Sequence, residues 1–289
     1  MAKITPQLVK ELRENTGAGM ADCKKALVET DGDMKQAVEF LRKKGAASAA
    51  KRSDKAAKEG MVVASTDDNG KKGIMVEINC ETDFVAKNDE FVKYANTVAG
   101  TLLKNKLQDV DALMKAEVAG DTIEGIHNEI LAKFSENIMI RRFIQLETRG
   151  YIESYIHAGN KLGVLVEVTS DKLNDEAKSL VRDIAMQIAA MNPDFVNRDE
   201  VDQTTLEKEK DIYYKQAIDS GKKEEIADRI ANGRMEKFFS ENCLVEQVFV
   251  KDSKKTVKDV LKDISKLAGE EVDVTKFVRF SLGEEEDNE

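Results

Sequence analysis

Residue types that commonly carry out acid–base or nucleophilic chemistry are scarce in this sequence. Its 289 residues include two histidines, His127 and His157, and three cysteines, Cys23, Cys80 and Cys243. Neither histidine has a serine or cysteine arranged with it as a nucleophile and its general base. The cysteines are far apart and lack the C-x-x-C spacing of zinc sites and redox pairs. We therefore predict no catalytic residue, and three buried thiols in a reducing compartment.

Sites for a nucleotide or a metal ion are not evident either. Gly221-Lys222 lacks the upstream glycine and the hydroxyl of a phosphate-binding loop, and Gly17-Ala18-Gly19 is predicted to be a turn. His127 lies in a helical pattern, and we expect it to be a surface or partly hydrogen-bonded side chain. No spacing of Cys, His, Asp or Glu suggests a metal cage. We predict a protein that is not an enzyme, needs no cofactor, does not bind nucleotide directly and acts by binding a partner.

A comparison of the sequence with itself points to one short segment. Two glycines thirteen residues apart, followed by an apolar run, occur twice with an offset of 90 residues (Gly60 and Gly73; Gly150 and Gly163). The acidic helix starts that follow, at Asn88 and Asn174, are offset by only 86 residues. The first copy therefore has four extra residues, located near Thr82-Asp83-Phe84-Val85.

Two interpretations of these extra residues remain open at this point. A large apolar side chain on a lengthened loop predicts a probe directed at another molecule. Alternatively, Asp83 shapes a turn and Phe84 packs ahead of the helix at Asn88 as a hydrophobic staple.

Hydrophobic periodicity and turn residues predict an α+β fold. The expected elements are three short helices within 5–44, with the third ending at Gly45, and then a linker over 45–58. Two β-hairpins, each followed by a helix, come next, with short helices at 110–119 and 122–134 and a strand at 138–146. Residues 203–219 and 222–240 predict a projecting antiparallel helical hairpin. A strand at 244–250, a helix at 257–267, a strand at 273–280 and a solvated acidic tail at 284–289 complete the chain.

These elements predict a division into three parts. Residues 1–55 form a three-helix domain and linker, 56–146 the first core subdomain, and 147–289 the second core subdomain, including the hairpin 203–240 and the acidic tail. The narrow apolar stripes of the hairpin leave self-association through 203–240 possible.

Charge limits the classes of partner. The net charge is −10, which argues against binding to a nucleic-acid backbone. Residues 1–58 carry 13 Lys and Arg against 8 Asp and Glu, a net charge of +5. Most of that excess lies between Arg42 and Lys58, as a solvated linker helix or as a patch that steers an acidic partner. No apolar run is long enough to cross a membrane, so we expect a cytoplasmic protein.

Several motifs resemble those of the elongation factor Ts family, the guanine nucleotide exchange factors for the translational GTPase elongation factor Tu. The stretch Asn79–Asn88, which contains the four extra residues, is similar to the family signature. Leu12–Leu27 resembles its N-terminal motif, and Ile140-Arg141-Arg142 and Tyr155–Gly159 are similar as well. The resemblance covers residues 1 to about 282.

The resemblance implies both a fold and a site. It implies a ubiquitin-associated-like three-helix domain, two related α+β subdomains and a helical hairpin. It further implies that Thr82–Val85 dislodges Mg²⁺ from elongation factor Tu, with Asp83 making polar contacts and Phe84 entering an apolar slot between helices. Arg13 and Met20 would touch the same domain of the GTPase, and His157 a different one. An interaction module that binds a ubiquitin-like or nascent-chain partner through the three helices is the alternative.

Overall fold

The computed structural model describes residues 4–50 and 55–284. Its first part is a three-helix unit of α1 (Pro6–Thr16), α2 (Met20–Glu29) and α3 (Met34–Ala50). Helix α1 begins where Leu8 N–H donates to the side chain of Thr5, at 3.2 Å, and ends at Gly17, whose φ is 69°. Leu12, Cys23 and Leu27 are completely buried between the helices. The three predicted helices are confirmed.

The end of the third helix differs from the sequence prediction. Helix α3 does not end at Gly45 but continues to Ala50. A Cβ atom at Gly45 would lie 2.6 Å from the Cα of Ala132 in α7 (Ile123–Phe134), so this glycine allows two helices to cross closely rather than ending one. Part of the predicted linker is therefore helix, and residues 51–54 lie outside the described chain.

The first half of the core is built on the antiparallel sheet β1-β2-β5. Its elements are β1 (Glu59–Thr66), β2 (Lys72–Cys80), α4 (Asp83–Ala86), α5 (Asp89–Lys104), α6 (Val110–Met114), β3 (Glu117–Val118), β4 (Asp121–Thr122), α7 and β5 (Met139–Glu147). The predicted helix at 110–119 is wrong beyond Met114. Ala119 and Gly120, both with positive φ, turn the chain there into a small hairpin instead.

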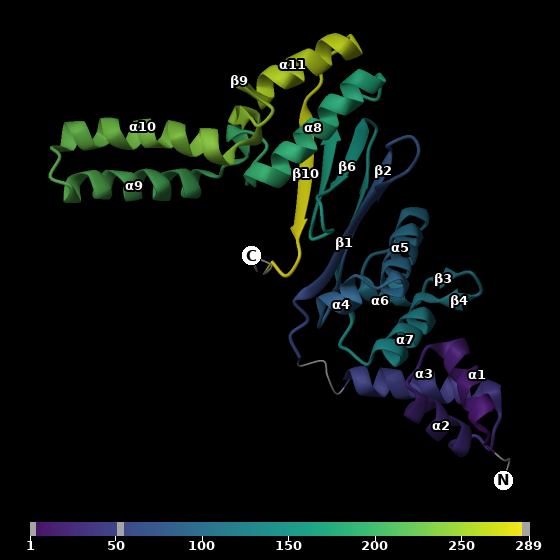
Figure 1. The fold of residues 1–289 in the computed structure, drawn as a ribbon. Coiled ribbons are helices and arrows are strands. Elements are labelled where there is room, and N and C mark those ends of the chain that lie inside the picture. The colour runs from purple at the N-terminus through teal and green to yellow at the C-terminus, as the bar shows by residue number, and fades with distance from the viewer. Residues whose placement is uncertain (1–3, 51–54, 285–289) are drawn as a thin grey trace.

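The second half is built on the antiparallel sheet β10-β7-β6. Its elements are β6 (Tyr151–Ile156), β7 (Leu162–Val168), α8 (Asp175–Met191), η1 (Arg198–Glu200), α9 (Gln203–Asp219), α10 (Glu224–Asn242), η2 (Leu244–Glu246), β8 (Val248–Phe249), β9 (Asp252–Thr256), α11 (Val257–Ala268) and β10 (Val274–Ser281). The hairpin α9–α10 projects from the core as predicted (Figure 1).

The predicted strand at 244–250 is mostly wrong. Its first residues form η2, and only Val248 and Phe249 pair as a strand, with β9. Leu244 N–H donates to the carbonyl of Phe195, and Val245 N–H to that of Val196. The apolar run is therefore buried by the chain that leads away from α8, without joining a large sheet.

The internal repeat is longer than the sequence comparison indicated. In both halves the first hairpin and helix are followed by a small hairpin, a second helix and a third strand of the sheet. Helices α7 and α11 have 12 residues each and begin after a capping threonine, Thr122 or Thr256. Both end at a left-handed residue, Ser135 or Gly269, so this part of the repeat has an offset of 134 residues.

The two sheets pack face to face through equivalent residues. Their shared core consists of three pairs of counterparts: Val62 and Ile152, Met75 and Leu165, and Leu146 and Phe280. A Cβ atom at Gly73 would lie 2.7 Å from a side-chain atom of Ile152, and one at Gly163 would lie 2.7 Å from a side-chain atom of Val62. The repeated glycines thus allow each sheet to approach the other, in a self-complementary interface.

Helices cover the outer face of each sheet (Figure 1). Helices α5 and α7 enclose one hydrophobic core with the first sheet, and α8 and α11 enclose a second core with the other. Among the described residues, none of the helices combines the length and the apolar character needed to cross a bilayer.

A buried carboxylate joins three distant segments of the core. Glu77 in β2 is completely buried and is paired with Arg142, at 2.8 Å, and Arg141, at 3.3 Å. Its Oε1 also accepts the N–H of Gly283, at 2.9 Å. Glu284, predicted to begin a solvated tail, is exposed and also pairs with Arg279 at 3.3 Å. Residues 285–289 of that tail lie outside the described chain.

Candidate functional site

The four extra residues of the first repeat form one helical turn, α4. Thr82 is its N-cap, and the Thr82 hydroxyl accepts the N–H of Val85, at 3.4 Å. Lys87, just after the turn, donates to the carboxylate of Asp83, at 2.7 Å. The corresponding loop of the second repeat has no helix and leads directly to Asn174, which caps α8. The insertion predicted from the repeat offsets is therefore an added turn of helix.

The turn directs its two large apolar side chains in opposite directions. Phe84 is 83% exposed, whereas Val85 is 7% exposed and belongs to the core of the first half. The staple interpretation of Phe84 is therefore wrong, because Val85 makes the inward contact. Of the segment Thr82–Val85, Phe84 is the exposed residue, and the side chain of Asp83 beside it is 46% exposed.

Asp83 is an ionised group on the surface. The hydrogen bond from Lys87 lowers the pKa of Asp83 from its ordinary value, and the positive charge of Lys161 acts in the same direction. The carboxylate next to Phe84 is therefore charged at neutral pH and ready to accept hydrogen bonds.

A turn from the second half lies beside α4. Asp83, Ala86 and Lys87 share a surface hollow with Gly159, Asn160 and Lys161, from the turn between β6 and β7. The carbonyl of Asn160 accepts the N–H of Val62 in β1, at 2.7 Å, and Lys161 pairs with Glu59 at 2.7 Å. The site around α4 is therefore assembled from both halves of the core.

The other candidate residues lie at separate places on the surface. His157 is exposed at the start of the same β6–β7 turn, with its Nδ1 3.0 Å from the hydroxyl of Tyr155. Arg13, in the last turn of α1, and Met20, at the start of α2, are exposed on the three-helix unit. The structure thus brings the turn that carries His157 next to α4, and leaves Arg13 and Met20 on a different unit.

Comparisons with known proteins place the chain in a family. The family model described as "Elongation factor TS" matches residues 81–284. The chain belongs to the elongation factor Ts family. It is 46% identical to elongation factor Ts of Clostridium perfringens (strain SM101 / Type A), over 97% of this chain and 93% of that protein. Elongation factor Ts of Clostridium tetani (strain Massachusetts / E88) is 47% identical over 97% of this chain and 94% of that protein.

Membership of the elongation factor Ts family establishes the activity. The chain is a nucleotide exchange factor for elongation factor Tu in translation elongation, and not a catalytic enzyme. The family resemblance and the α+β fold inferred from the sequence are confirmed. The bacterial elongation factors it resembles also agree with the predicted cytoplasmic location.

In this member of the elongation factor Ts family, the other histidine is structural. His127 is 9% exposed, and its Nδ1 lies 2.7 Å from the hydroxyl of Tyr94. Burial lowers the pKa of His127 to about 4, so the ring is neutral at neutral pH. The prediction of a surface or partly bonded histidine was wrong about the surface, because α7 turns this face toward α5.

The described thiols and carboxylates form no metal-binding cluster. Cys23, Cys80 and Cys243 are buried and free, as expected, and burial raises the pKa of Cys80 to about 12. Within residues 4–50 and 55–284, no group of three or more His, Cys, Asp and Glu side chains is arranged to hold a metal ion.

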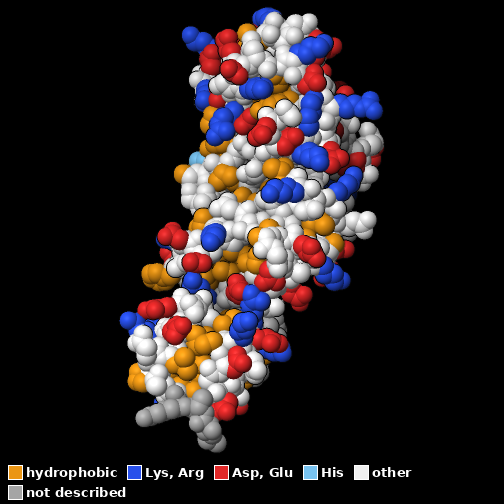
Figure 2. All heavy atoms as spheres, turned by 90° about the vertical axis from the view of Figure 1, so that its right-hand side faces the viewer, with side chains coloured by type: hydrophobic (Ala, Val, Ile, Leu, Met, Phe, Trp, Pro, Cys, Tyr) orange, Lys and Arg blue, Asp and Glu red, His pale blue; other side chains and the backbone are white. Residues whose placement is uncertain are grey.

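The start of the basic segment is engaged within the protein. Arg42 pairs with Asp121, at 3.0 Å, and with Glu129. Lys44 pairs with Asp22 on α2. On the face seen in Figure 2, positive and negative side chains alternate. These contacts join α3 to α7 and α2, and they favour a structural role over a patch that steers a partner.

Nothing in the sequence spacing pointed to Glu136, which holds the segment in front of α4. The two oxygens of its carboxylate accept hydrogen bonds from Glu81 and Thr82, which lie 55 and 54 residues away. The only available signal was the second part of the repeat, in which Glu270 takes the equivalent position 134 residues later.

Proposed function

We propose that α4 is the part of this exchange factor that disturbs Mg²⁺ and GDP in elongation factor Tu. Phe84 enters an apolar slot of the GTPase, and Asp83 makes polar contacts beside it. The observation that carries this proposal is the 83% exposure of Phe84 on a helical turn that is capped and anchored. Among the described residues, Phe84 is the most exposed of the large apolar side chains, so a partner that received the ring would remove much apolar surface from water.

The anchoring of α4 supports binding as a wedge. Val85 is buried in the core, and Thr82 caps the turn, so the backbone on both sides of Phe84 is held before any partner arrives. Little conformational entropy is then lost when the ring is inserted, and more of the burial energy is left for displacing the GTPase elements.

Displacing a metal ion requires only a small shift in the GTPase. Mg²⁺ demands near-ideal octahedral geometry at short distances, and GDP is held through that ion and a cradle of backbone N–H groups. A wedge that moves these elements weakens nucleotide binding. Bound nucleotide in turn lowers the affinity of the GTPase for the exchange factor by the same ratio. Exchange of this kind needs no proton transfer by Asp83 or by any histidine.

We also propose secondary contacts away from α4. Arg13 and Met20 would touch the nucleotide-binding domain of elongation factor Tu from the three-helix unit, and His157 would contact another of its domains. Their exposure supports these roles, since all three side chains are accessible. Because the His157 turn adjoins α4, its contact would fix the orientation of the wedge on the GTPase.

We propose that the three parts, 1–55, 56–146 and 147–289, are the structural domains of this factor. Separate hydrophobic cores within each part support the division. The small core shared by both sheets supports treating the last two parts as tightly joined halves.

Release of labelled GDP from elongation factor Tu tests the role of Phe84. Burying a phenylalanine is worth about 2–3 kcal/mol, so Phe84→Ala should slow the accelerated release about 30- to 150-fold. Val250→Ala, which truncates a 47% exposed side chain far from α4 in sequence, is the control and should leave the rate unchanged. Normal release with a folded Phe84→Ala protein would show that the ring is not the wedge.

A further inference from the structure

We propose that Glu136 is a positioning residue for nucleotide exchange, which holds α4 so that Phe84 faces the GTPase. This inference rests on the proposed role of Phe84. Glu136 lies in the turn between α7 and β5 and is half-buried. It is not part of the wedge itself, and its carboxylate accepts hydrogen bonds from the residues that lead into α4.

Three hydrogen bonds end on this one carboxylate. Oε2 accepts the backbone N–H groups of Glu81, at 3.2 Å, and Thr82, at 3.1 Å. Oε1 accepts the hydroxyl of Thr82, at 2.7 Å. All three donors belong to the two residues in front of α4, so the carboxylate determines the direction in which the helical turn begins.

The turn holding Glu136 is itself tied to three segments. The side chain of Glu81 accepts the N–H of Asn137, at 2.7 Å, which makes the contact between the two segments reciprocal. Asn137 Nδ2 donates to the carbonyl of Lys55, at 2.9 Å, in the chain that arrives from the three-helix unit. The preceding helix α7 crosses α3 closely at Gly45. Glu136 therefore links α4 to a rigid part of the molecule.

A short helix needs such external support. One turn of four residues is unstable by itself, because fixing the backbone of the first turn costs more free energy than its hydrogen bond contributes. Hydrogen bonds to a carboxylate are stronger than bonds between neutral groups. The Glu136 clamp and the burial of Val85 are therefore what hold Phe84 in one direction, and removing the charge should loosen the ring without removing it.

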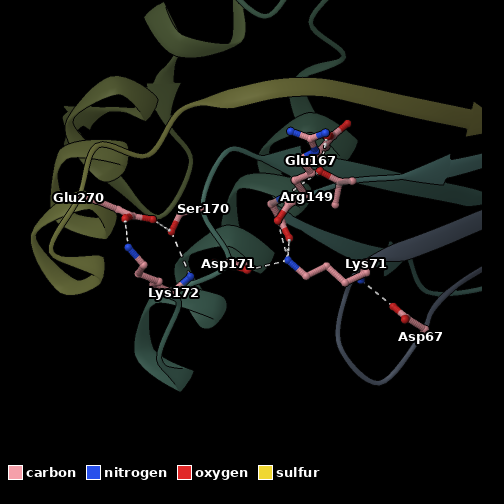
Figure 3. Close-up of polar contacts among 10 residues, drawn as sticks. Asp67, Lys71, Arg149, Glu167, Ser170, Asp171, Lys172 and Glu270 are labelled. Atoms are coloured by element: carbon pink, nitrogen blue, oxygen red, sulfur yellow. Dashed lines mark hydrogen bonds and ion pairs between the residues drawn. The ribbon is translucent and has the colours of Figure 1, made fainter.

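The second half of the core contains the matched residue. Glu270 follows α11 as Glu136 follows α7, and its carboxylate accepts the hydroxyl of Ser170 and pairs with Lys172 at 2.6 Å (Figure 3). Ser170 and Lys172 belong to the loop after β7, the counterpart of the loop that leads into α4. Glu270 thus makes the same type of clamp on a loop that carries no wedge, and Glu270→Gln is the control.

The first experiment measures GDP release over a range of factor concentrations. Glu136→Gln removes one acceptor oxygen and the charge with little change in shape. We expect the maximal rate to fall about tenfold, the value of one charge-assisted hydrogen bond, while the half-saturating concentration changes less than about threefold. Glu270→Gln should change neither. A merely structural role would lower the active fraction or weaken binding instead.

The second experiment follows the ring itself. The chain has no tryptophan, so Phe84→Trp introduces a single reporter at the wedge. Adding Glu136→Gln should lower the fluorescence anisotropy of that tryptophan, whereas adding Glu270→Gln should not. Melting temperatures show whether each variant is folded, and if Glu136→Gln is unstable, Thr82→Ala removes the hydroxyl from the other side of the clamp.

The outcomes separate this inference from the role of Phe84. If Phe84→Ala exchanges normally, the wedge assignment fails. If Phe84→Ala is slow but Glu136→Gln keeps both the rate and the anisotropy, the positioning role alone is wrong. If the double variant Phe84→Ala/Glu136→Gln releases GDP no more slowly than Phe84→Ala, Glu136 acts through the ring. A further tenfold loss would overturn it, because Glu136 would then act independently.

Discussion

The loops that follow β2 and β7 occupy equivalent corners of a two-fold repeated core, but they have different structures. After β2 the chain forms α4 and exposes Phe84 to solvent. After β7 the chain goes directly to α8, and its loop is closed by ion pairs of Lys71 with Asp171 and of Lys172 with Glu270 (Figure 3). One half therefore presents a side chain to a partner, while the other ends in contacts within the molecule.

The scaffold around the two corners is nevertheless the same. The carbonyl of Gly70 accepts the N–H of Ile152, at 2.8 Å, and the carbonyl of Asn160 accepts the N–H of Val62, at 2.7 Å. Gly70 and Asn160 also share a left-handed conformation. Each hairpin turn thus docks on the other half in the same way. The difference in function arises from one added helical turn on a duplicated frame.

Buried polar groups also distinguish the halves. The first half has the buried carboxylate Glu77 and the buried pair Tyr94–His127. By the offsets of the repeat, their counterparts are Glu167, which is half-buried, and the apolar residues Leu180 and Leu261. At these positions, buried polar contacts in the first half therefore correspond to a partly solvated carboxylate and two apolar side chains in the second.

The largest expected effect tests the buried carboxylate. Glu77→Ala should lower the free energy of unfolding by about 3–5 kcal/mol, because it removes the buried carboxylate that pairs with Arg141 and Arg142. Glu167→Ala, the matched change, should cost less than about 1 kcal/mol, because that side chain is partly solvated. Urea unfolding measures both values, and equal losses would contradict the asymmetry between the halves.

The next prediction shortens the loop after β2 to the length of the loop after β7. Deleting Asp83–Ala86 removes Phe84, so stimulated GDP release should fall at least as far as in Phe84→Ala, equivalent to about 2–3 kcal/mol. The protein should still fold, because α8 begins at Asn174 without such a turn. Circular dichroism checks the fold. Rapid exchange by the deleted protein would mean that the corners do not differ in function.

A third prediction replaces the buried pair Tyr94–His127 with the apolar residue type found at the equivalent positions of the second half. His127 has a pKa of about 4 in the folded protein against 6.5 ordinarily, so its stabilising contribution is complete above pH 6.5 and is lost as the pH falls toward 4. Between pH 7 and pH 5, the titration of His127 should lower the parent's free energy of unfolding by about 2 kcal/mol. Replacing both Tyr94 and His127 by leucine should abolish this part of the loss.

The same pair provides its own control. At pH 7 the double leucine variant should be close to the parent in stability, because neither partner is left without a hydrogen bond. His127→Leu alone should be less stable, because it leaves the buried hydroxyl of Tyr94 without its partner. Unfolding curves at pH 5, 6 and 7 give these differences, and an unchanged pH dependence would assign the acid sensitivity to other groups.

The smallest effect is expected in the loop after β7, which is closed by ion pairs. Lys71→Met removes the ion pair with Asp171 and the hydrogen bonds to the carbonyls of Arg149 and Gly150. Its side chain is 35% exposed, so the loss of stability should be under about 1 kcal/mol. GDP release should not change. A clear loss of exchange would show that both corners contact the GTPase.

Features with a local cause were predicted well from the sequence. Asn88 and Asn174 cap helices as expected, and both hairpins and the α9–α10 pair form where their turn residues and apolar periodicity indicated. Errors arose where a distant segment decided the outcome. Gly45 was interpreted as a helix end, although its role is to let α7 approach α3.

The candidate site shows the same division. The extra residues were detected as a difference between two repeat offsets, and Asp83 and Phe84 were named from it. The clamp of Glu136 on Thr82 could not be inferred, because it joins residues 54 positions apart. The burial of Val85 could not be inferred either, because it depends on how α4 packs against β1 and β2. The second part of the repeat escaped notice because α9 and α10 separate its elements in one half only.

By itself, the sequence determined where the repeats lie, which copy has an added turn, and which family motifs it carries. Periodicity, capping and offsets are properties of neighbouring residues, and they can be counted along the chain. Only the tertiary structure decided which side of α4 faces the solvent, which turn adjoins it and which carboxylate holds it. These outcomes depend on burial and hydrogen bonding between segments that meet only after the two sheets have packed together.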